Sequence, residues 1–277
     1  MVARVQGSFA TRAVPGTRFT DVRAVEVTGS TNADLLAEAA DGAPEGIVLV
    51  ADHQTAGRGR LDRTWSAPPG SALLVSVLLR PSLAPEQAHA VGLAGGIAAC
   101  DACAELTGVS PGLKWPNDLV AVGDERWRDR KLAGLLTETI VGGGGLRAVV
   151  LGMGLNLTWG GAPPPELAAG AVTLEELAGA DVDRERMLVV WLRRLDAELE
   201  LLAGSDGRAR LAARARDRSA TLGRRVRVER PDGALTGTAT DVTASGHLVV
   251  APDDDGPAVV VAVGDVVHLR HRGPAAG

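Results

Sequence analysis

The sequence predicts an α+β fold, in which a mixed β-sheet is flanked by helices and followed by a small C-terminal β-barrel. Up to about residue 220, apolar runs typical of buried strands lie between longer amphipathic or Ala-rich segments typical of helices. From Thr221 onward, short alternating segments are joined by Pro-Asp-Gly and Ser-Gly turns, a pattern typical of a small barrel. We therefore expect a flexible N-terminal arm over residues 1–22, a main domain over 23–220 and a barrel over 221–271.

The first part of the chain is predicted to hold the arm, one helix and two strands. Residues 1–22 have no apolar periodicity, so we expect them to be flexible. A helix begins near Thr31, with Thr31 and Asp34 as the expected capping pair. Continuous apolar runs predict buried strands over 46–54 and 72–80. The loop between these strands is basic, rich in glycine and about seventeen residues long, and loops of that length are usually functional or disordered.

The rest of the main domain follows from the same periodicities. A long Ala-rich segment is apolar on nearly all sides, which indicates a buried helix. A run of four glycines between two apolar segments indicates the turn of a hairpin. In chain order, the predicted elements are a helix over 85–106, a strand-turn-strand unit over 113–122, a hairpin over 131–159, a helix over 184–202 and a basic helix over 206–220.

Composition excludes several classes of protein. The formal net charge is −5, whereas dedicated nucleic-acid-binding domains usually carry a basic balance. No stretch approaches the ~20 apolar residues of a membrane span, and the N-terminus lacks the apolar core of a secretory signal. Two cysteines cannot form a disulfide framework, so we expect a reducing cytosol. We predict a cytoplasmic enzyme that binds neither nucleic acid nor membranes.

Lysine is almost absent from the chain. Of 29 basic residues only Lys114 and Lys131 are lysines, and the three asparagines are Asn32, Asn117 and Asn156. This depletion, together with enrichment of Ala, Gly, Arg and Val, indicates the coding bias of a GC-rich genome. A lysine kept against that bias fills a position that Arg cannot, because Arg is a wide planar fork and Lys a compact point charge. All five residues fall within segments that other observations mark as sites.

Common site motifs are missing or incomplete. No G-x-x-x-x-G-K-[ST] sequence exists, which excludes the standard P-loop. The glycine pattern that starts at Gly57 lacks the third glycine of a dinucleotide-binding motif, because Asp62 stands there. Cys100 and Cys103 have C-x-x-C spacing, but a zinc site needs four ligands. We interpret these cysteines as small apolar residues of a buried helix.

Three arginines in the glycine-rich loop suggest an anion clamp. Arg58, Arg60 and Arg63 lie beside glycines that let backbone amides approach an anion, and guanidinium groups bind phosphate in bidentate fashion. A solvated basic loop is the alternative interpretation. Trp65 follows the arginines, where it would anchor the loop or cover a ligand.

Other segments combine charged, polar and small residues. KWPND (Lys114–Asp118) gathers a cation, an aromatic ring, an amide and a carboxylate around a proline, and neither Trp nor Lys has an ordinary turn role. Asn117 and Asp118 are residue types that orient a nucleotide or hold Mg²⁺. Lys131 starts an apolar strand, where it would neutralise an anionic ligand or merely solubilise the strand end. Ser30–Asn32 would either cap a helix or bind a small polar group.

Together these segments resemble the biotin protein ligases, which attach biotin to a carboxylase carrier domain. The five segments occur in the family's order, and the resemblance covers about residues 23–270, including an SH3-like C-terminal barrel. Bifunctional members carry an N-terminal winged helix-turn-helix, but only about 22 residues precede the core here, so we expect the monofunctional type. The matching segments are STN (Ser30–Asn32), HQTAGRGR (His53–Arg60) with Trp65, KWPNDL (Lys114–Leu119), RKLAGLLTE (Arg130–Glu138) and GMGLN (Gly152–Asn156).

The resemblance implies a reaction in two steps. Biotin's carboxylate attacks the α-phosphate of Mg·ATP and gives biotinyl-5′-AMP and pyrophosphate. A lysine of a biotin carboxyl carrier domain, such as that of acetyl-CoA carboxylase, then attacks the mixed anhydride. ATP and Mg²⁺ are therefore the expected co-substrates, with no tightly bound metal. Since neither step needs an enzyme nucleophile, positioning and charge stabilisation would carry the catalysis.

The resemblance also implies roles for individual residues. Lys131 would bridge the biotin carboxylate and the α-phosphate, Arg58 and Arg60 would stabilise the adenylate, and Asp118 would hold Mg²⁺. The residues expected to contact biotin are Ser30, Thr31, Asn32, Gln54, Gly57, Arg58, Gly59, Arg60, Trp65, Lys131, Gly134 and Gly154. Those expected to contact the nucleotide are Arg58, Arg60, Arg63, Lys114, Trp115, Asn117 and Asn156.

One departure and two rival hypotheses stay open. Many family members have a third loop glycine where this chain has Leu61-Asp62, and the Asp62 carboxylate is expected to pair with Arg60 or Arg63. The rivals are a lipoate or octanoate ligase or transferase of the same fold, and a non-catalytic ligand sensor. The arginine loop together with KWPND favours biotin, and the expected oligomeric state is a monomer or a homodimer. Nine arginines over 208–230 are expected to be a solvated face or to contact an acidic carrier domain.

Overall fold

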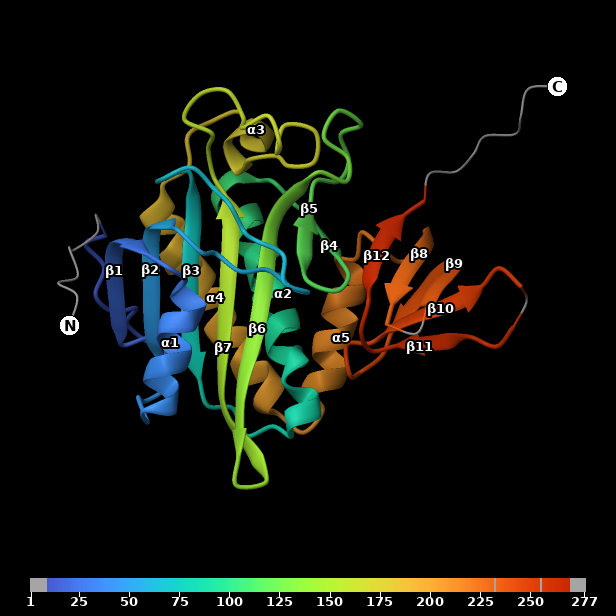
Figure 1. Cartoon of the computed structure of the whole chain (residues 1–277), viewed down its shortest axis with the longest axis horizontal. Coiled ribbons are helices and arrows are strands. Elements are labelled where there is room, and N and C mark those ends of the chain that lie inside the picture. The colour runs from blue at the N-terminus through green and yellow to red at the C-terminus, as the bar shows by residue number, and fades with distance from the viewer. Residues whose placement is uncertain (1–8, 232, 255, 270–277) are drawn as a thin grey trace.

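A computed structural model of the chain describes residues 9–231, 233–254 and 256–269. A seven-stranded sheet and a five-stranded sheet lie side by side along the longest axis of the molecule (Figure 1). In chain order the elements are β1 (Asp21–Thr28), α1 (Thr31–Ala40), β2 (Ile47–Gln54), β3 (Ala72–Leu79), a 3₁₀ turn (Pro85–Gln87), α2 (His89–Thr107), β4 (Gly112–Lys114), β5 (Asp118–Val120), β6 (Lys131–Gly142), β7 (Gly145–Asn156), α3 (Leu174–Ala178), α4 (Arg184–Ala203), α5 (Gly207–Asp217), β8 (Arg225–Arg230), β9 (Gly233–Val242), β10 (Leu248–Pro252), β11 (Val259–Val261) and β12 (Asp265–His268).

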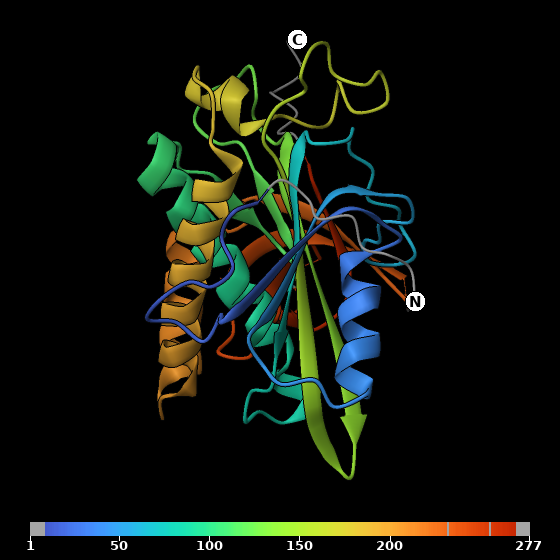
Figure 2. The same cartoon turned by 90° about the vertical axis from the view of Figure 1, so that its left-hand side faces the viewer.

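The larger sheet is mixed, as predicted. Its strand order is β1-β2-β3-β7-β6-β5-β4, with β1 and β2 parallel and the remaining neighbours antiparallel. Helices α2 and α4 cover one face and α1 covers the other (Figure 2). Strands covered on both faces are apolar along their whole length rather than alternating. All eight residues of β3 are accordingly buried, which explains why its sequence is an unbroken apolar run.

Helix α2 is the central helix of the core. Pro85–Thr107 is long and apolar enough, by length and composition alone, to cross a membrane, but in this fold most of it is buried against the sheet and α4. Trp191 of α4 is fully buried and donates its indole N–H to the carbonyl of Gly95 at 3.2 Å. A Cβ at Gly95 would lie 2.6 Å from the Leu151 side chain, so glycine lets the helix approach the sheet without displacing Leu151.

The two cysteines behave as apolar core residues. Cys100 and Cys103 are free thiols, both buried in α2. Burial raises the pKa of Cys100 to about 12 and also raises the pKa of Cys103, so neither forms a reactive thiolate near neutral pH. The interpretation as structural residues agrees with this environment.

The expected flexible arm is wrong for residues 9–22. Phe9, Val14 and Phe19 are at most 3% exposed and belong to the main core, which fixes the segment by apolar burial. Thr11 donates its backbone N–H to the Glu185 carboxylate at 2.5 Å, so the segment is also bonded to α4. Residues 1–8 lie outside the described residues. Sparse but large apolar residues gave no periodic signal, which is why the sequence suggested a loose segment.

The N-cap of helix α1 lies one residue before the expected Thr31. Its N-cap is Ser30, whose hydroxyl accepts the N–H of Ala33 at 3.4 Å. The predicted Thr31–Asp34 pair is therefore wrong, and Asp34 instead accepts a bond from the Thr28 hydroxyl at 2.6 Å. With the cap provided by Ser30, the next two side chains are free to serve another purpose.

The smaller sheet is antiparallel, with the order β11-β10-β9-β8-β12. Its strands alternate between buried and exposed residues, as the sequence predicted, because only one face is packed. The predicted barrel is not closed: over the described residues the edge strands β11 and β12 do not pair, since both are very short. Trp115, from the β4–β5 turn of the larger sheet, packs into this second core and links the two sheets.

Candidate active site

A cavity of about 430 Å³ lies where the larger sheet, the loop between β2 and β3, the β4–β5 turn and β12 meet. It brings together residues that are more than 200 positions apart in the chain. Of the predicted site residues, it is lined by Ser30, Thr31, Asn32, Gln54, Arg58, Gly59, Arg60, Arg63, Trp65, Lys114, Trp115, Asn117, Asp118, Lys131, Gly134 and Gly154.

One end of the cavity carries uncharged polar groups bonded to one another. We call Thr31, Asn32, Gln54 and Ser76 the neutral end. Ser76 donates its hydroxyl to Asn32 Oδ1 at 2.6 Å, and its oxygen lies 2.7 Å from Thr31 Oγ1. Gln54 Oε1 accepts the backbone N–H of Thr31 at 2.7 Å. Because Thr31, Asn32 and Ser76 are at most 4% exposed, each hydrogen bond fixes a side chain that cannot turn to water instead.

Glycines form the floor between β6 and β7. Gly134 and Gly154 are direct partners in the antiparallel register, and the Trp65 indole lies across them. A Cβ at Gly154 would lie 2.3 Å from Trp65 Cε2, and one at Gly152 would lie 2.1 Å from Asn32 Oδ1. Only glycine therefore allows the Trp65 ring and the Asn32 amide to rest against the sheet.

The arginine loop forms a tight turn over the cavity. Trp65 donates its backbone N–H to the Gly57 carbonyl at 2.9 Å, and Gly59 donates its N–H to the Arg63 carbonyl at 2.6 Å. Leu61 and Asp62 occupy the left-handed region at φ values of 53° and 56°. This is the conformation that glycine adopts without cost, so the non-glycine pair strains the turn.

The other end of the cavity is charged. We call Arg58, Arg60, Arg63 and Lys131, with the carboxylates that face them, the ionic end. Arg58 pairs with Glu138 at 3.0 Å, Lys131 Nζ lies 2.7 Å from Asp118 Oδ1, and Arg63 pairs with Asp265 of β12. The expected pairing of Asp62 is thus wrong, since the Arg63 partner comes from the smaller sheet.

Arg60 is the most enclosed of the loop arginines. It donates loosely, at 3.4 Å each, to Asn117 Oδ1 and to the Gly264 carbonyl. Burial lowers the pKa of Arg60, while Asp265 and Asp118 act in the opposite direction. A cation held by such long bonds in a partly dehydrated site is well placed to accept an anionic ligand.

The KWPND segment divides between two roles. Asn117 donates its amide to the Leu135 carbonyl at 2.7 Å and directs its oxygen toward Arg60, and Lys114 lines the cavity. Trp115 donates its indole N–H to the Gly246 carbonyl at 3.0 Å and packs with the smaller sheet. The sequence therefore located this segment but missed the structural role of its tryptophan.

Two predicted site residues lie outside the cavity lining. Asn156 is 5% exposed and donates to the carbonyls of Lys131 and Val172, both at 3.3 Å, so its amide is bonded within the protein and its contact with nucleotide stays a prediction. The strand end that carries it is covered by the chain around Val172. Gly57 is buried at the base of the loop, where its Cβ position is 2.5 Å from the Trp65 carbonyl. It shapes the loop rather than the cavity wall.

Three residues of the site were missed. Ser76 is the lone polar residue of β3, and a hydroxyl in an otherwise apolar buried strand was an available signal. Glu138 lies in the RKLAGLLTE segment and binds both Arg58 and Asn32, the latter at 2.8 Å. Asp265 gave no local signal, because its role depends on how the two sheets pack.

The arrangement fits a ligand with two chemically different ends. The neutral end offers donors and acceptors to an uncharged polar group, whereas the ionic end offers cations to phosphate or carboxylate. Over the described residues no group of three or more His, Cys, Asp or Glu side chains could hold a metal ion. Asp118 offers one carboxylate, which faces Lys131. A single carboxylate suits Mg²⁺ only when phosphate oxygens complete the coordination.

Comparisons with known proteins match two parts of the chain to known families. Residues 24–156 match the Biotin/lipoate A/B protein ligase family, and residues 221–269 match the Biotin protein ligase C terminal domain. A biotin--[acetyl-CoA-carboxylase] ligase of Mycobacterium tuberculosis is 44% identical over 261 residues, covering 92% of this chain and 91% of the relative. A ligase of the same name from Paracoccus denitrificans is 32% identical over 257 residues, covering 90% and 92%.

Solved structures show the same fold. The biotin protein ligase of Aquifex aeolicus in complex with biotin and ATP superposes with a TM-score of 0.75 at 25% identity, covering 91% of this chain and all of that one. The Leishmania major biotin protein ligase in complex with biotinyl-5-AMP gives a TM-score of 0.57 at 22% identity, covering 87% and 98%.

Proposed function

The chain belongs to the biotin/lipoate A/B protein ligase family, and from this membership we propose that it is a biotin–[acetyl-CoA-carboxylase] ligase. The observation that carries the proposal is a single cavity with a neutral end and an ionic end. Biotin has the same two halves, an uncharged ureido ring and a carboxylate. We propose the cytoplasm as its location.

In the first step we propose that the biotin carboxylate oxygen attacks the α-phosphorus of ATP. The new O–P bond replaces the bond to pyrophosphate, which leaves, and the product is biotinyl-5′-AMP. Lys131 would lie between the two reacting groups and reduce the repulsion between their negative charges. Its present partner Asp118, at 2.7 Å, shows that the ammonium group already faces an anionic oxygen at this place.

The arginine loop would hold the phosphates. Arg58 and Arg60 both line the cavity, and each is bonded to a neighbour that a phosphate oxygen could replace. Asn117 and Asp118 lie below them on the β4–β5 turn. We propose that Asp118 holds Mg²⁺ brought by the nucleotide, and the metal would neutralise phosphate charge. The residues present fit such a shared site better than a metal site made by the protein alone.

In the second step the amine of a carrier-domain lysine attacks the biotinyl carbonyl carbon. The C–N bond forms, the C–O bond to AMP breaks, and the amine loses a proton. AMP is a good leaving group, so the protein needs only to hold the anhydride and exclude water. This agrees with the cysteines being buried in α2, away from the cavity lining.

The protein partner would be a biotin carboxyl carrier domain rather than nucleic acid. Three arginines at the C-terminal end of α5 support this choice, because they are bonded within the protein. Arg214 and Arg218 pair with Asp101 at 3.0 and 2.6 Å, and Arg216 pairs with Asp241 at 2.5 Å. Arginines whose charges are satisfied internally are poorly placed to contact phosphate backbones.

Biotin-dependent exchange of pyrophosphate into ATP tests the proposal, with lipoate and octanoate as parallel substrates. Exchange with biotin alone supports it, because the four bonded polar groups of the neutral end would be left partly unpaired by the apolar ring or chain of the other acids. Exchange with lipoate alone would keep the adenylation chemistry and overturn the substrate. No exchange with any acid would favour a ligand sensor.

A further inference from the structure

The arginine loop is tied to the smaller sheet at its edge strand β12. Asp265, the first residue of β12, pairs with Arg63, and the preceding Gly264 accepts a bond from Arg60 at 3.4 Å. The Asp265 side chain is 18% exposed, whereas that of Arg63 is 69% exposed. The carboxylate is therefore the enclosed partner of this pair, and the arginine is the exposed one.

Strand β12 is itself anchored to the larger sheet. His268 lies 3.1 Å from the Asp129 carboxylate through Nδ1 and 3.2 Å from the Thr221 hydroxyl through Nε2. Thr221 in turn accepts the backbone N–H of Trp115 at 3.1 Å. Asn117 lies two residues after Trp115 and faces Arg60. A chain of hydrogen bonds therefore joins β12, which bears Asp265, to the β4–β5 turn.

The loop needs an external anchor because its own conformation is unfavourable. Leu61 and Asp62 are both left-handed, a conformation that non-glycine residues keep only where their surroundings hold it. Within the loop, the bonds between Gly57 and Trp65 and between Gly59 and Arg63 close the turn. The contact between Arg63 and Asp265 connects the tip of this turn to the rest of the protein.

We propose that Asp265 is a positioning residue for the adenylation step, which acts through Arg63 to hold the loop so that Arg58 and Arg60 face the phosphates. The inference rests on the proposed function. It makes the smaller sheet a part of the nucleotide site, although Asp265 itself need not touch the ligand.

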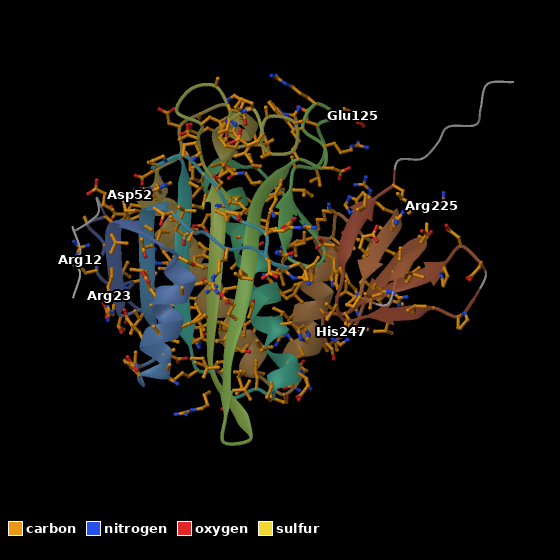
Figure 3. All side chains as sticks on the ribbon, in the orientation of Figure 1. Arg12, Arg23, Asp52, Glu125, Arg225 and His247 are labelled. Carbon is orange, nitrogen blue, oxygen red and sulfur yellow. The ribbon has the colours of Figure 1, made fainter. Side chains whose placement is uncertain are left out.

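The test measures biotin-dependent pyrophosphate exchange for Asp265→Asn and for Asp253→Asn and compares both with the wild type. Asn keeps the size of the side chain and removes the charge. Asp253 is the matched control, because it pairs with Arg225 of β8 at 2.5 Å and neither residue lines the cavity (Figure 3 labels Arg225). Asp265→Asn should raise KM for ATP about five- to tenfold with little change in KM for biotin, as expected when a loop loses one charge-assisted anchor. Asp253→Asn should match the wild type, and Asp265→Glu should recover most of the loss.

A double-mutant cycle with Arg63→Ala separates positioning from general damage. If Asp265 acts through Arg63, Asp265→Asn adds less than a twofold change when Arg63 is already Ala. Arg63 is mostly exposed, so its truncation should leave the fold intact. Trypsin cleavage within the loop gives a readout without activity, and it should be faster in Asp265→Asn than in Asp253→Asn.

Two results would overturn the inference: an unchanged KM for ATP in Asp265→Asn, or a full additional loss in the Arg63→Ala background. An inactive wild type would instead contradict the proposed function, so the two failures are distinguishable.

Discussion

The two ends of the cavity differ in how deeply their side chains are buried and in the bonds that hold them. At the neutral end, Thr31, Asn32 and Ser76 are almost fully buried and bonded to one another over 2.6–2.7 Å. At the ionic end, the side chains of Arg58 and Lys131 are 44% and 38% exposed, and both pair with carboxylates. Half of the cavity is therefore fixed, and half can exchange one partner for another.

This difference matches the chemistry that each end has to recognise. A buried network of neutral groups is costly to leave unpaired, so it rejects a ligand that lacks matching polar atoms. Exposed ion pairs are weak because water and salt compete with them, so an incoming phosphate replaces a carboxylate at little cost. Specificity should reside at the neutral end, and catalysis and nucleotide binding at the ionic end.

The strongest test of this division is Lys131→Ala. It should lower the rate of biotinyl-adenylate formation by about 100- to 1000-fold, because it removes the cation placed at the developing charge. The thermal midpoint should change little, since the side chain is 38% exposed. Single-turnover quench measurements with labelled ATP check the rate, and Lys131→Arg serves as the control that keeps the charge but not its compact shape. A rate within tenfold of wild type in Lys131→Ala would remove this lysine from the chemistry.

A second test enlarges the floor at the neutral end. The Cβ of Gly152→Ala would lie 2.1 Å from Asn32 Oδ1, so the Asn32 amide must move and its bond from Ser76 must break. Biotin affinity should fall by about 10- to 100-fold, with roughly 1–3 kcal/mol lost from the free energy of unfolding through overpacking. Calorimetric titration and urea denaturation measure the two effects. Gly161→Ala, which has no neighbour within 4 Å of its Cβ, is the control.

A smaller change removes one hydroxyl. Ser76→Ala should weaken biotin binding about tenfold, the usual cost of leaving buried partners unsatisfied, while KM for ATP stays the same. Ser71→Ala is the matched control, because Ser71 is also buried but donates to the Pro68 carbonyl at 2.7 Å, outside the cavity lining. Equal effects of Ser76→Ala on both substrates would contradict a specificity confined to the neutral end.

The smallest expected effect is a pH dependence of stability. It arises from two histidines that lie where the smaller sheet contacts the rest of the protein. Burial lowers the pKa of His268, and burial together with the nearby His247 lowers the pKa of His89 (Figure 3 labels His247). A lowered histidine pKa means that the unfolded chain binds more protons than the folded chain below about pH 6.5, so stability falls as the pH drops through that value. The Asp129 pKa is lowered to about 2. Burial opposes this shift, but hydrogen bonds from Arg224 and His268 outweigh it. The Asp129 carboxylate therefore loses its contribution to stability only when the pH falls below its ordinary pKa of 3.8.

Urea denaturation at about pH 7.5 and about pH 5.5 checks the first of these steps. The free energy of unfolding should be lower at the acidic pH, and His89→Gln should reduce the difference. At the acidic pH, amide hydrogen exchange should become faster in β12 and the β9–β10 turn. It should stay unchanged in β2 and β3, which carry Gln54 and Ser76 of the neutral end. Higher stability at the acidic pH would contradict lowered histidine pKa values in the folded protein.

The sequence predicted the parts of the site whose signals are local. The glycine-rich loop, KWPND and the start of β6 each combine residue types that ordinary turns and strands do not require, and all of them reach the cavity. Local signals say less where long-range packing decides the outcome. Asn156 is turned into the protein by the chain around Val172, the Trp115 indole joins the second core, and Asp265 reaches the loop only because two sheets meet.

The scarcity of lysine also bears on the protein's chemical stability toward its own product. An acyl adenylate released into solution acylates whatever amines it meets, and most proteins expose many lysines. Both lysines of this chain, Lys114 and Lys131, line the same cavity. Apart from the N-terminal amine, its outer surface therefore offers escaped reagent nothing to modify. For the same reason, an amine-directed fluorophore or cross-linker can modify, besides the N-terminal amine, only the two lysines of the cavity, and bound ligand should protect both without any engineering of the chain.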